Sequence, residues 1–157
     1  MHPAVVHFPV VLAFLLPAMA LGTLWAIRRG ARARRAWALP LSFAVALAAS
    51  AWLAVETGEG QDERVEKVVA EQPLSTHEDM AETFMAASMV LAVVAAAGLL
   101  GGIPGRAARL VTAAGSLVLL AGAARVGHSG GELVYKYGAA SAYVPSANTP
   151  AAVGGAR

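Results

Sequence analysis

The chain has 157 residues, of which 57% are apolar and 14% are charged, and its mean hydropathy is +0.59. This composition is too apolar for an ordinary soluble domain, and the chain is too long for a single membrane anchor, so we expect an all-α polytopic membrane protein. Cysteine is absent, which excludes disulfides, thiolate metal sites and covalently attached c-type haem. The net charge of +2 decides little, because the distribution of charges along the chain matters more.

Two histidines, His2 and His7, lie at the beginning of an otherwise unbroken apolar run at the start of the chain. Residues 4–27 carry no formal charge when His7 is neutral, and as a helix they would be about 36 Å long. That length crosses a bilayer core of about 30 Å, so we expect the first transmembrane helix here. The arginines follow this run instead of preceding it as in a signal peptide, which predicts that the segment is retained.

Five arginines and no acidic residue occupy residues 28–35. The positive-inside rule places this short loop in the cytoplasm, where it can also contact anionic lipids, and we expect no nucleic-acid binding. Residues 37–55 form the predicted second span, with Trp37 and Trp52 near its two ends as interfacial anchors. This span returns the chain to the outside.

The outer loop, residues 56–79, begins the acidic part of the chain. Residues 56–82 hold nine of the ten acidic residues: Glu56, Glu59, Asp62, Glu63, Glu66, Glu71, Glu78, Asp79 and Glu82. Acidic residues influence topology less than lysine and arginine do, but their absence from the arginine-rich loops agrees with the predicted orientation.

Two local patterns lie between the second and third spans. Valines at helical spacing within residues 61–72 predict a short amphipathic helix that ends at Pro73. The sequence from Ser75 to Glu78 is typical of a capping box, in which Ser75 begins a helix. We therefore expect the third span over residues 80–100.

A second cytoplasmic turn is predicted at residues 101–109, which contain two arginines and no acid. The fourth span follows over residues 110–126 and contains Arg125 near its end. Together the four spans predict a four-transmembrane-helix bundle in the bacterial inner membrane, with both termini on the periplasmic side. Residues 1–140 form this domain, and residues 141–157 form a flexible tail.

All four histidines fall on the outer side of this topology, together with several charged residues. Neighbouring helix ends in a bundle are about 10 Å apart, so side chains from several helices can converge there. Residues that would bind haem b, through axial histidines and an arginine beside a propionate, are His2, His7, His77, His128 and Arg125. A non-haem transition metal would take its ligands from His7, His77, His128, Glu56 and Glu59. The alternative is that the histidines only lie at the lipid headgroups.

These features leave three kinds of function open. The first is a small haem- or metal-binding subunit for respiratory electron transfer, with a periplasmic or membrane redox partner. The second is a structural or assembly subunit that docks a partner protein, and the third is an ion or proton transporter that uses outer carboxylates such as Glu56, Glu59 and Glu82. No nucleophile–base pair, phosphate loop or nucleotide site is present in the sequence, so enzymatic activity of the isolated chain is the least favoured.

Two glycine patterns carry further alternatives. Residues 127–138 mix glycines with aromatic and charged residues, which predicts either a lid over the histidines or a helix end followed by an interfacial segment. Gly98 and Gly102 form a small-x-x-x-small pattern that permits close helix association. The pattern does not predict the oligomeric state.

The opening motif His-Pro-x-x-Val-His-Phe-Pro at residues 2–9, the loop leading to His77, and the glycine-rich segment at residues 127–135 resemble a bacterial membrane-protein family. This family is catalogued as domain of unknown function 2231, and the resemblance covers residues 1–140. It implies a four-helix integral membrane domain, sometimes found beside cytochrome-like modules, which favours a redox role. It also implies candidate functional residues at the motif positions His2, His7, His77 and His128.

Overall fold

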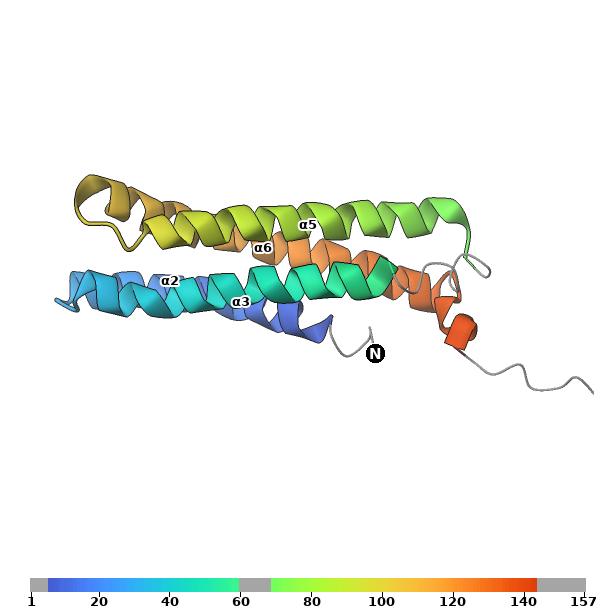
Figure 1. Ribbon diagram of the computed structural model, residues 1–157. Helices are drawn as coiled ribbons and strands as arrows, with labels where there is room; N and C mark the ends of the chain where they lie inside the picture. Colours follow the sequence, from blue (N-terminus) through green and yellow to red (C-terminus); the bar gives the residue numbers. More distant parts are fainter. Residues whose placement is uncertain (1–5, 60–68, 144–157) are drawn as a thin grey trace, which may run out of the picture.

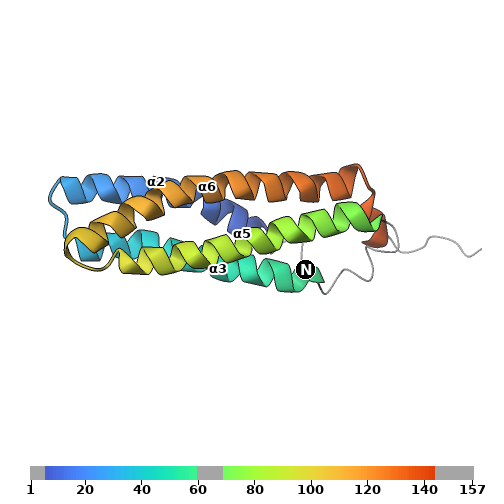
Figure 2. The same cartoon turned by 90° about the horizontal axis from the view of Figure 1, so that it is seen from above.

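The computed structural model describes residues 6–59 and 69–143 as four long helices and a short 3-10 helix (Figure 1). These elements are α2 (His7–Arg28), α3 (Ala33–Glu59), α5 (Glu71–Ala97), α6 (Gly102–Tyr135) and η1 (Ala139–Tyr143). Each long helix packs against two others in the cyclic order α2, α3, α5, α6, and the helices run alternately up and down (Figure 2). The prediction of an all-α four-helix bundle is thus confirmed for the described part of the chain.

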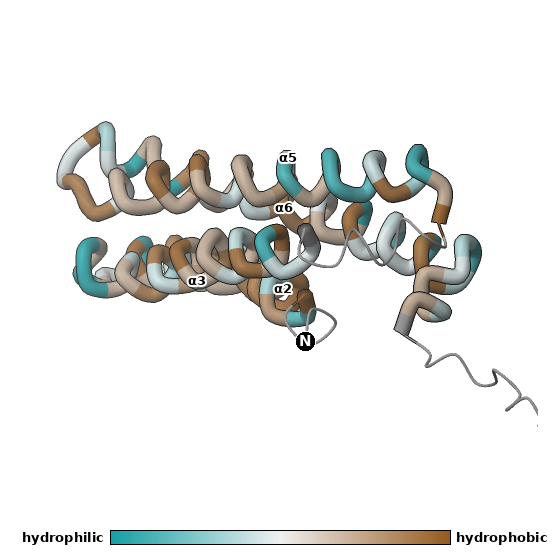
Figure 3. Tube along the Cα trace, turned by 45° about the vertical axis from the view of Figure 1, so that its right-hand side comes forward, coloured by the Kyte–Doolittle hydropathy of each residue, from teal (hydrophilic) through white to brown (hydrophobic). Residues whose placement is uncertain are grey.

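The outer surface of the bundle is apolar. Phe14, Val93 and Val118 expose 70%, 73% and 71% of their surface, although a water-soluble bundle would bury such side chains. In Figure 3 apolar residues run along the lengths of the helices, and hydrophilic ones mark the α2–α3 turn and the N-terminal half of α5. All four helices are long and apolar enough to cross a membrane. The chain is therefore a multi-pass membrane protein.

The interior is built mainly from alanine and leucine. Its largest cluster draws on all four helices and consists of Ala13, Leu16, Ala44, Leu47, Leu91, Ala95, Leu119 and Ala123. Alanines let the helix backbones approach closely, which increases van der Waals contact in a setting where lipid is as apolar as the core. The polar side chains of this interior bond to the backbone of their own helices: Ser88 to Phe84, Thr112 to Ala108 and Ser116 to Ala113.

Two helices extend beyond both of their predicted ends. The second span, expected over residues 37–55, is the helix α3 (Ala33–Glu59), and the fourth span, expected over residues 110–126, is the helix α6 (Gly102–Tyr135). The glycines of residues 127–131 remain helical, because tertiary contacts outweigh their weak helix propensity. The predicted lid over residues 127–138 is therefore wrong. The chain leaves the helix only at Lys136, and Gly138 adopts a positive φ of 74° in the turn that follows.

The start of α5 also differs from the prediction. The helix begins at Glu71, and Pro73 lies in its first turn, where a missing N–H group costs no hydrogen bond. Ser75 is inside the helix, and its hydroxyl bonds to the carbonyl of Gln72, so the predicted capping box is wrong. Of the amphipathic helix predicted over residues 61–72, residues 61–68 lie outside the described residues, and Val69 is not helical.

Trp37 lies inside the bundle and not at the lipid interface, which corrects its predicted role as an anchor. It is fully buried, and its indole Nε1–H donates a hydrogen bond to the carbonyl of Ala95 at 2.9 Å. Gly98 lies directly against the indole ring, and a Cβ at this position would overlap it. Gly98 therefore permits close packing of α5 on the Trp37 side chain of α3 within one chain. Trp52, the second predicted anchor, is 46% exposed, as an interfacial position requires.

Arg109 closes the turn between α5 and α6. Its side chain is buried, its Nε donates to the carbonyl of Gly98 at 2.7 Å, and its Nη2 donates to the carbonyl of Leu100 at 3.0 Å. Gly98 is the C-cap of α5 and Leu100 lies in the turn that follows, so Arg109 places a positive charge beside the end of a helix that carries a partial negative charge. Gly105 lies against the Leu100 carbonyl, where a Cβ would overlap it. One arginine thus fixes the helix end and the turn together.

Candidate functional site

The predicted functional residues in the described part lie at one end of the bundle. His7 begins α2, Glu56 and Glu59 end α3, His77 lies near the start of α5, and Arg125 and His128 lie in the last third of α6. Because the helices alternate in direction, these positions share the end opposite to the α2–α3 and α5–α6 turns (Figure 1). The predicted segregation of histidines from arginine-rich turns is confirmed for these residues. His2 lies outside the described residues.

Helices α5 and α6 continue beyond the other two helices at this end (Figure 1). We call residues 71–82 of α5 and 125–135 of α6 the extension. At 1.5 Å per residue, each of these two helical segments is about 16–18 Å long. Its α5 half exposes three acidic side chains, Glu71, Asp79 and Glu82, whereas the same helix exposes Val90 and Val93 further along. The exposed positions of α5 thus change from acidic to apolar along the helix.

A seam of glycines joins α5 to α6 along the membrane and into the extension. Every seventh residue of α5 lies over a glycine of α6, and the pairs are Leu91 with Gly115, Phe84 with Gly122 and His77 with Gly130. A Cβ on Gly115 would lie 2.6 Å from Leu91 Cδ1. The same atom on Gly130 would lie 3.0 Å from His77 Cε1. The extension therefore repeats the packing of the transmembrane part, with an imidazole in the place of an apolar side chain.

His77 is held on α6 by Ser129. The distance between His77 Nδ1 and Ser129 Oγ is 2.8 Å, and the Ser129 hydroxyl also donates to the carbonyl of Val126 at 3.0 Å. The Ser129 hydroxyl thus connects the imidazole of His77 to the backbone of α6. Sequence reasoning missed Ser129 and Gly130, although Gly115, Gly122 and Gly130 recur at intervals of seven or eight residues.

The tip of the extension has an apolar cluster of its own. Val69, Leu74, Leu133 and Ala139 are buried against one another, which fastens η1 and the start of α5 to the end of α6. On the outside, Lys136 Nζ lies 3.3 Å from Glu132 Oε1 in an exposed ion pair. Interactions with Tyr137 and with Glu132 raise the pKa of Lys136, so this residue stays protonated at neutral pH. The extension is thus an ordered helix pair.

The structure does not bring the candidate ligands into one cluster. Within residues 6–59 and 69–143, no three His, Asp or Glu residues are placed to hold a metal ion. His7 and His128 are exposed, and Arg125 is exposed as well. An exposed arginine on a membrane helix can extend its guanidinium toward the lipid headgroups. The imidazole of His77 rests on Gly130, which leaves no space for a porphyrin between α5 and α6 there.

No family model, no curated protein and no solved structure matches this chain. The resemblance to domain of unknown function 2231 therefore stays a prediction.

Proposed function

We propose that this chain is a structural or assembly subunit of the bacterial inner membrane, and that its extension docks a partner protein. In this proposal the arginine-rich turns face the cytoplasm, as the positive-inside rule predicts, and both termini and the extension face the periplasm. The partner presents a basic surface to the acidic side of α5. The proposal makes no demand for catalysis by the isolated chain.

The observation that carries the proposal is the continuation of α5 and α6 beyond the apolar part of the bundle. The glycine seam, the His77–Ser129 hydrogen bond and the apolar cluster at the tip hold these two helices in register outside the membrane. A surface that is rigid before binding loses little conformational entropy when a partner binds. The exposed carboxylates of Glu71, Asp79 and Glu82 provide the charge complementarity that steers and selects a basic partner.

Site-specific photocrosslinking in intact cells tests this proposal. A photoreactive residue placed at Thr76 or Asp79, both exposed on the extension, should give one discrete crosslinked product with a protein that is basic outside the membrane. The same residue placed at Val93, 73% exposed among the lipids, serves as the control and should crosslink to no protein. Equal products at all three positions, or no product at Thr76 and Asp79, would contradict docking.

Charge variants make the test specific. The double variant Asp79→Asn and Glu82→Gln should reduce the crosslinked yield from Thr76 because it removes charge facing the partner. The matched control exchanges Glu132→Lys with Lys136→Glu, which reverses an exposed ion pair within the extension and leaves its net charge unchanged. Docking by charge pattern predicts a loss in the first variant and an unchanged yield in the second.

A second candidate, a haem b or a non-haem transition metal at the same end, rests on the placement of the histidines. His7, His77 and His128 all lie at this end of the bundle, on three different helices. Further ligands would have to come from His2 or from a partner. Optical spectra of the oxidised and reduced protein, with elemental analysis, test this: a Soret band or bound metal lost in His77→Ala supports it, and a colourless, metal-free protein contradicts it.

The transporter alternative has no comparable observation. A path for ions or protons through one bundle needs polar groups that face one another along the axis. In the described interior, the hydroxyls of Ser88, Thr112 and Ser116 are hydrogen-bonded to their own helices, and Arg109 is bonded to backbone carbonyls.

A further inference from the structure

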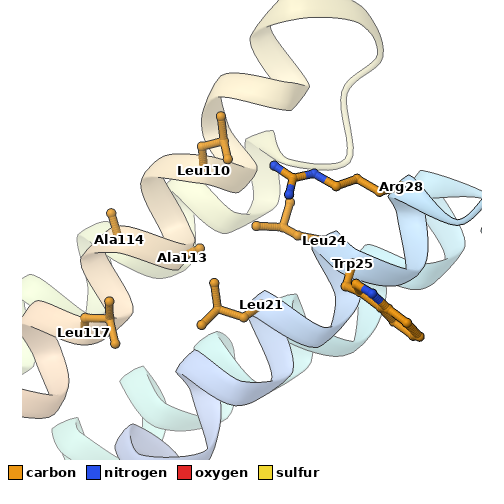
Figure 4. A pocket seen from close by; sticks show the side chains of 8 residues that line it. All are labelled: Leu21, Leu24, Trp25, Arg28, Leu110, Ala113, Ala114 and Leu117. Carbon is orange, nitrogen blue, oxygen red and sulfur yellow. The ribbon is translucent and has the colours of Figure 1, made fainter.

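A groove of about 340 Å³ runs between α2 and α6 near the arginine-rich end (Figure 4). Its walls are formed by Leu21 and Leu24 of α2 and by Leu110 and Leu117 of α6. Two residues of α6 with small side chains, Ala113 and Ala114, leave the space between these walls open. Outside the groove the two helices pack against each other. The groove is therefore a gap between two helices, and its apolar lining faces lipid.

Arg28 lies at the end of this groove. It is in the last turn of α2, and in Figure 4 its guanidinium extends over the groove toward α6. The neighbouring arginine, Arg29, does not line the groove, and its guanidinium stacks on the ring of Trp25 at 4.9 Å from the centroid. Trp25 itself is one of the lining residues. The groove thus has one cationic group at its mouth and apolar side chains along its length.

Among residues 6–59 and 69–143, no aspartate or glutamate lies at this end of the bundle to neutralise Arg28. Residues 1–55 and 83–131 contain no aspartate or glutamate, so neither α2 nor the adjoining parts of α3, α5 and α6 supply a partner for Arg28. The same end carries Arg29, Arg32, Arg34, Arg35 and Arg106. The occupant that complements this end must bring a negative charge to Arg28 and an apolar chain to the groove.

We propose that the α2–α6 groove binds one anionic phospholipid, with an acyl chain along the leucines and the headgroup phosphate on Arg28. A chain in the groove covers apolar side chains that a neighbouring helix would otherwise cover, and basic pockets between transmembrane helices favour anionic headgroups. The preference for the anionic lipid comes from Arg28 together with the surrounding arginines. The site is at the opposite end from the extension and does not depend on the docking function.

Native mass spectrometry of the purified full chain tests this proposal. The protein is equilibrated in detergent with phosphatidylglycerol and phosphatidylcholine that carry the same acyl chains. We expect preferential retention of phosphatidylglycerol, and about a fivefold weaker retention in Arg28→Gln, the effect of one arginine near a membrane surface. The matched control, Arg34→Gln, changes the net charge equally at an exposed position that does not line the groove, and it should retain the lipid. Equal losses in the two variants would overturn a specific site.

Filling the groove tests the acyl chain independently of the charge. Ala114 is exposed and lines the groove, so Ala114→Phe should reduce retention of the lipid while the fold stays intact. Val118→Phe, on an exposed part of the same helix outside the groove, is the control and should leave retention unchanged. If lipid retention is unchanged in Ala114→Phe but is abolished by inorganic phosphate, the site binds a simple anion. A dimer with Leu117 at its interface would show a second copy of the chain. Either result overturns the proposal.

Discussion

The two ends of the bundle are built in opposite ways. At the arginine-rich end, short turns join the helices, and Trp37 and Arg109 donate hydrogen bonds to backbone carbonyls at and just beyond the C-terminal end of α5. At the histidine end, α5 and α6 continue past their neighbours and are held together by side chains on glycines. At the first end, therefore, polar side chains stabilise the fold by binding backbone carbonyls. At the second end, charged side chains are exposed on the surface of a helix pair. Four substitutions test this difference, from the largest expected effect to the smallest.

Replacing Arg109 should have the largest effect. Arg109→Met leaves the carbonyls of Gly98 and Leu100 buried without their charged donor, which should cost roughly 2–5 kcal/mol of stability. Arg106→Met, at an exposed position one turn earlier, is the control and should change stability by less than about 0.5 kcal/mol. Unfolding in mixed micelles with increasing denaturing detergent measures both. Equal stability of the two variants would show that the buried arginine does not fix this end.

Gly98→Ala should have the next largest effect. The added methyl group would overlap the Trp37 indole, and overpacking of this kind typically costs about 1–3 kcal/mol. Gly101→Ala is the matched control, since nothing lies within 4 Å of a Cβ there. The same unfolding measurement applies, and near-ultraviolet circular dichroism reports whether the indole moves. An unchanged tryptophan signal in a fully stable Gly98→Ala protein would contradict the contact.

Ser129→Ala should loosen the histidine end alone. Loss of the hydrogen bond to His77 should cost about 0.5–1.5 kcal/mol. Hydrogen exchange should become faster in residues 71–82, while the amides around Trp37 and Arg109 stay protected. The control is Ser75→Ala, because that exposed hydroxyl bonds only to its own helix. Faster exchange throughout the bundle would mean that the extension is not a separate unit of stability.

Gly127→Ala should have the smallest effect and the opposite sign. A Cβ at Gly127 meets nothing within 4 Å, so the change should stabilise the helix by about 0.5–1 kcal/mol. Gly130→Ala gains the same helix propensity but places its methyl group 3.0 Å from His77 Cε1, so it should gain less. Thermal denaturation in detergent compares the two. A larger gain at Gly130 than at Gly127 would contradict the close contact with the imidazole.

The sequence was informative where one physical effect dominates. Apolar runs bounded by arginines predict four spanning helices, because lipid requires every backbone group to be bonded within its own segment. Helix ends were harder to predict: Ser75 and Glu78 match a capping box, yet α5 starts at Glu71, and α6 continues through the glycines near Ser129, where His77 packs on Gly130. Such contacts join residues about fifty positions apart, which local patterns do not contain.

The candidate site was predictable only in its location. Periodicity and charge placed the histidines at one end, which the bundle confirms for His7, His77 and His128. Their directions depend on helix rotation and on neighbours, so the outward position of Arg125 and the Ser129 contact of His77 needed coordinates. The roles of Trp37 and Arg109 could not be predicted either, because an aromatic residue or an arginine near the end of a span is typical of an interfacial anchor.

The length of α6 has a mechanical consequence. Its 34 residues form an uninterrupted helix of about 51 Å, whereas the apolar core of a bilayer is about 30 Å thick. One end of this rod carries the surface on which Ser129 holds His77, and the other end carries the arginine that closes the α5–α6 turn. A force that tilts the His77 end of this rigid helix must therefore also displace the α5–α6 turn about 51 Å away.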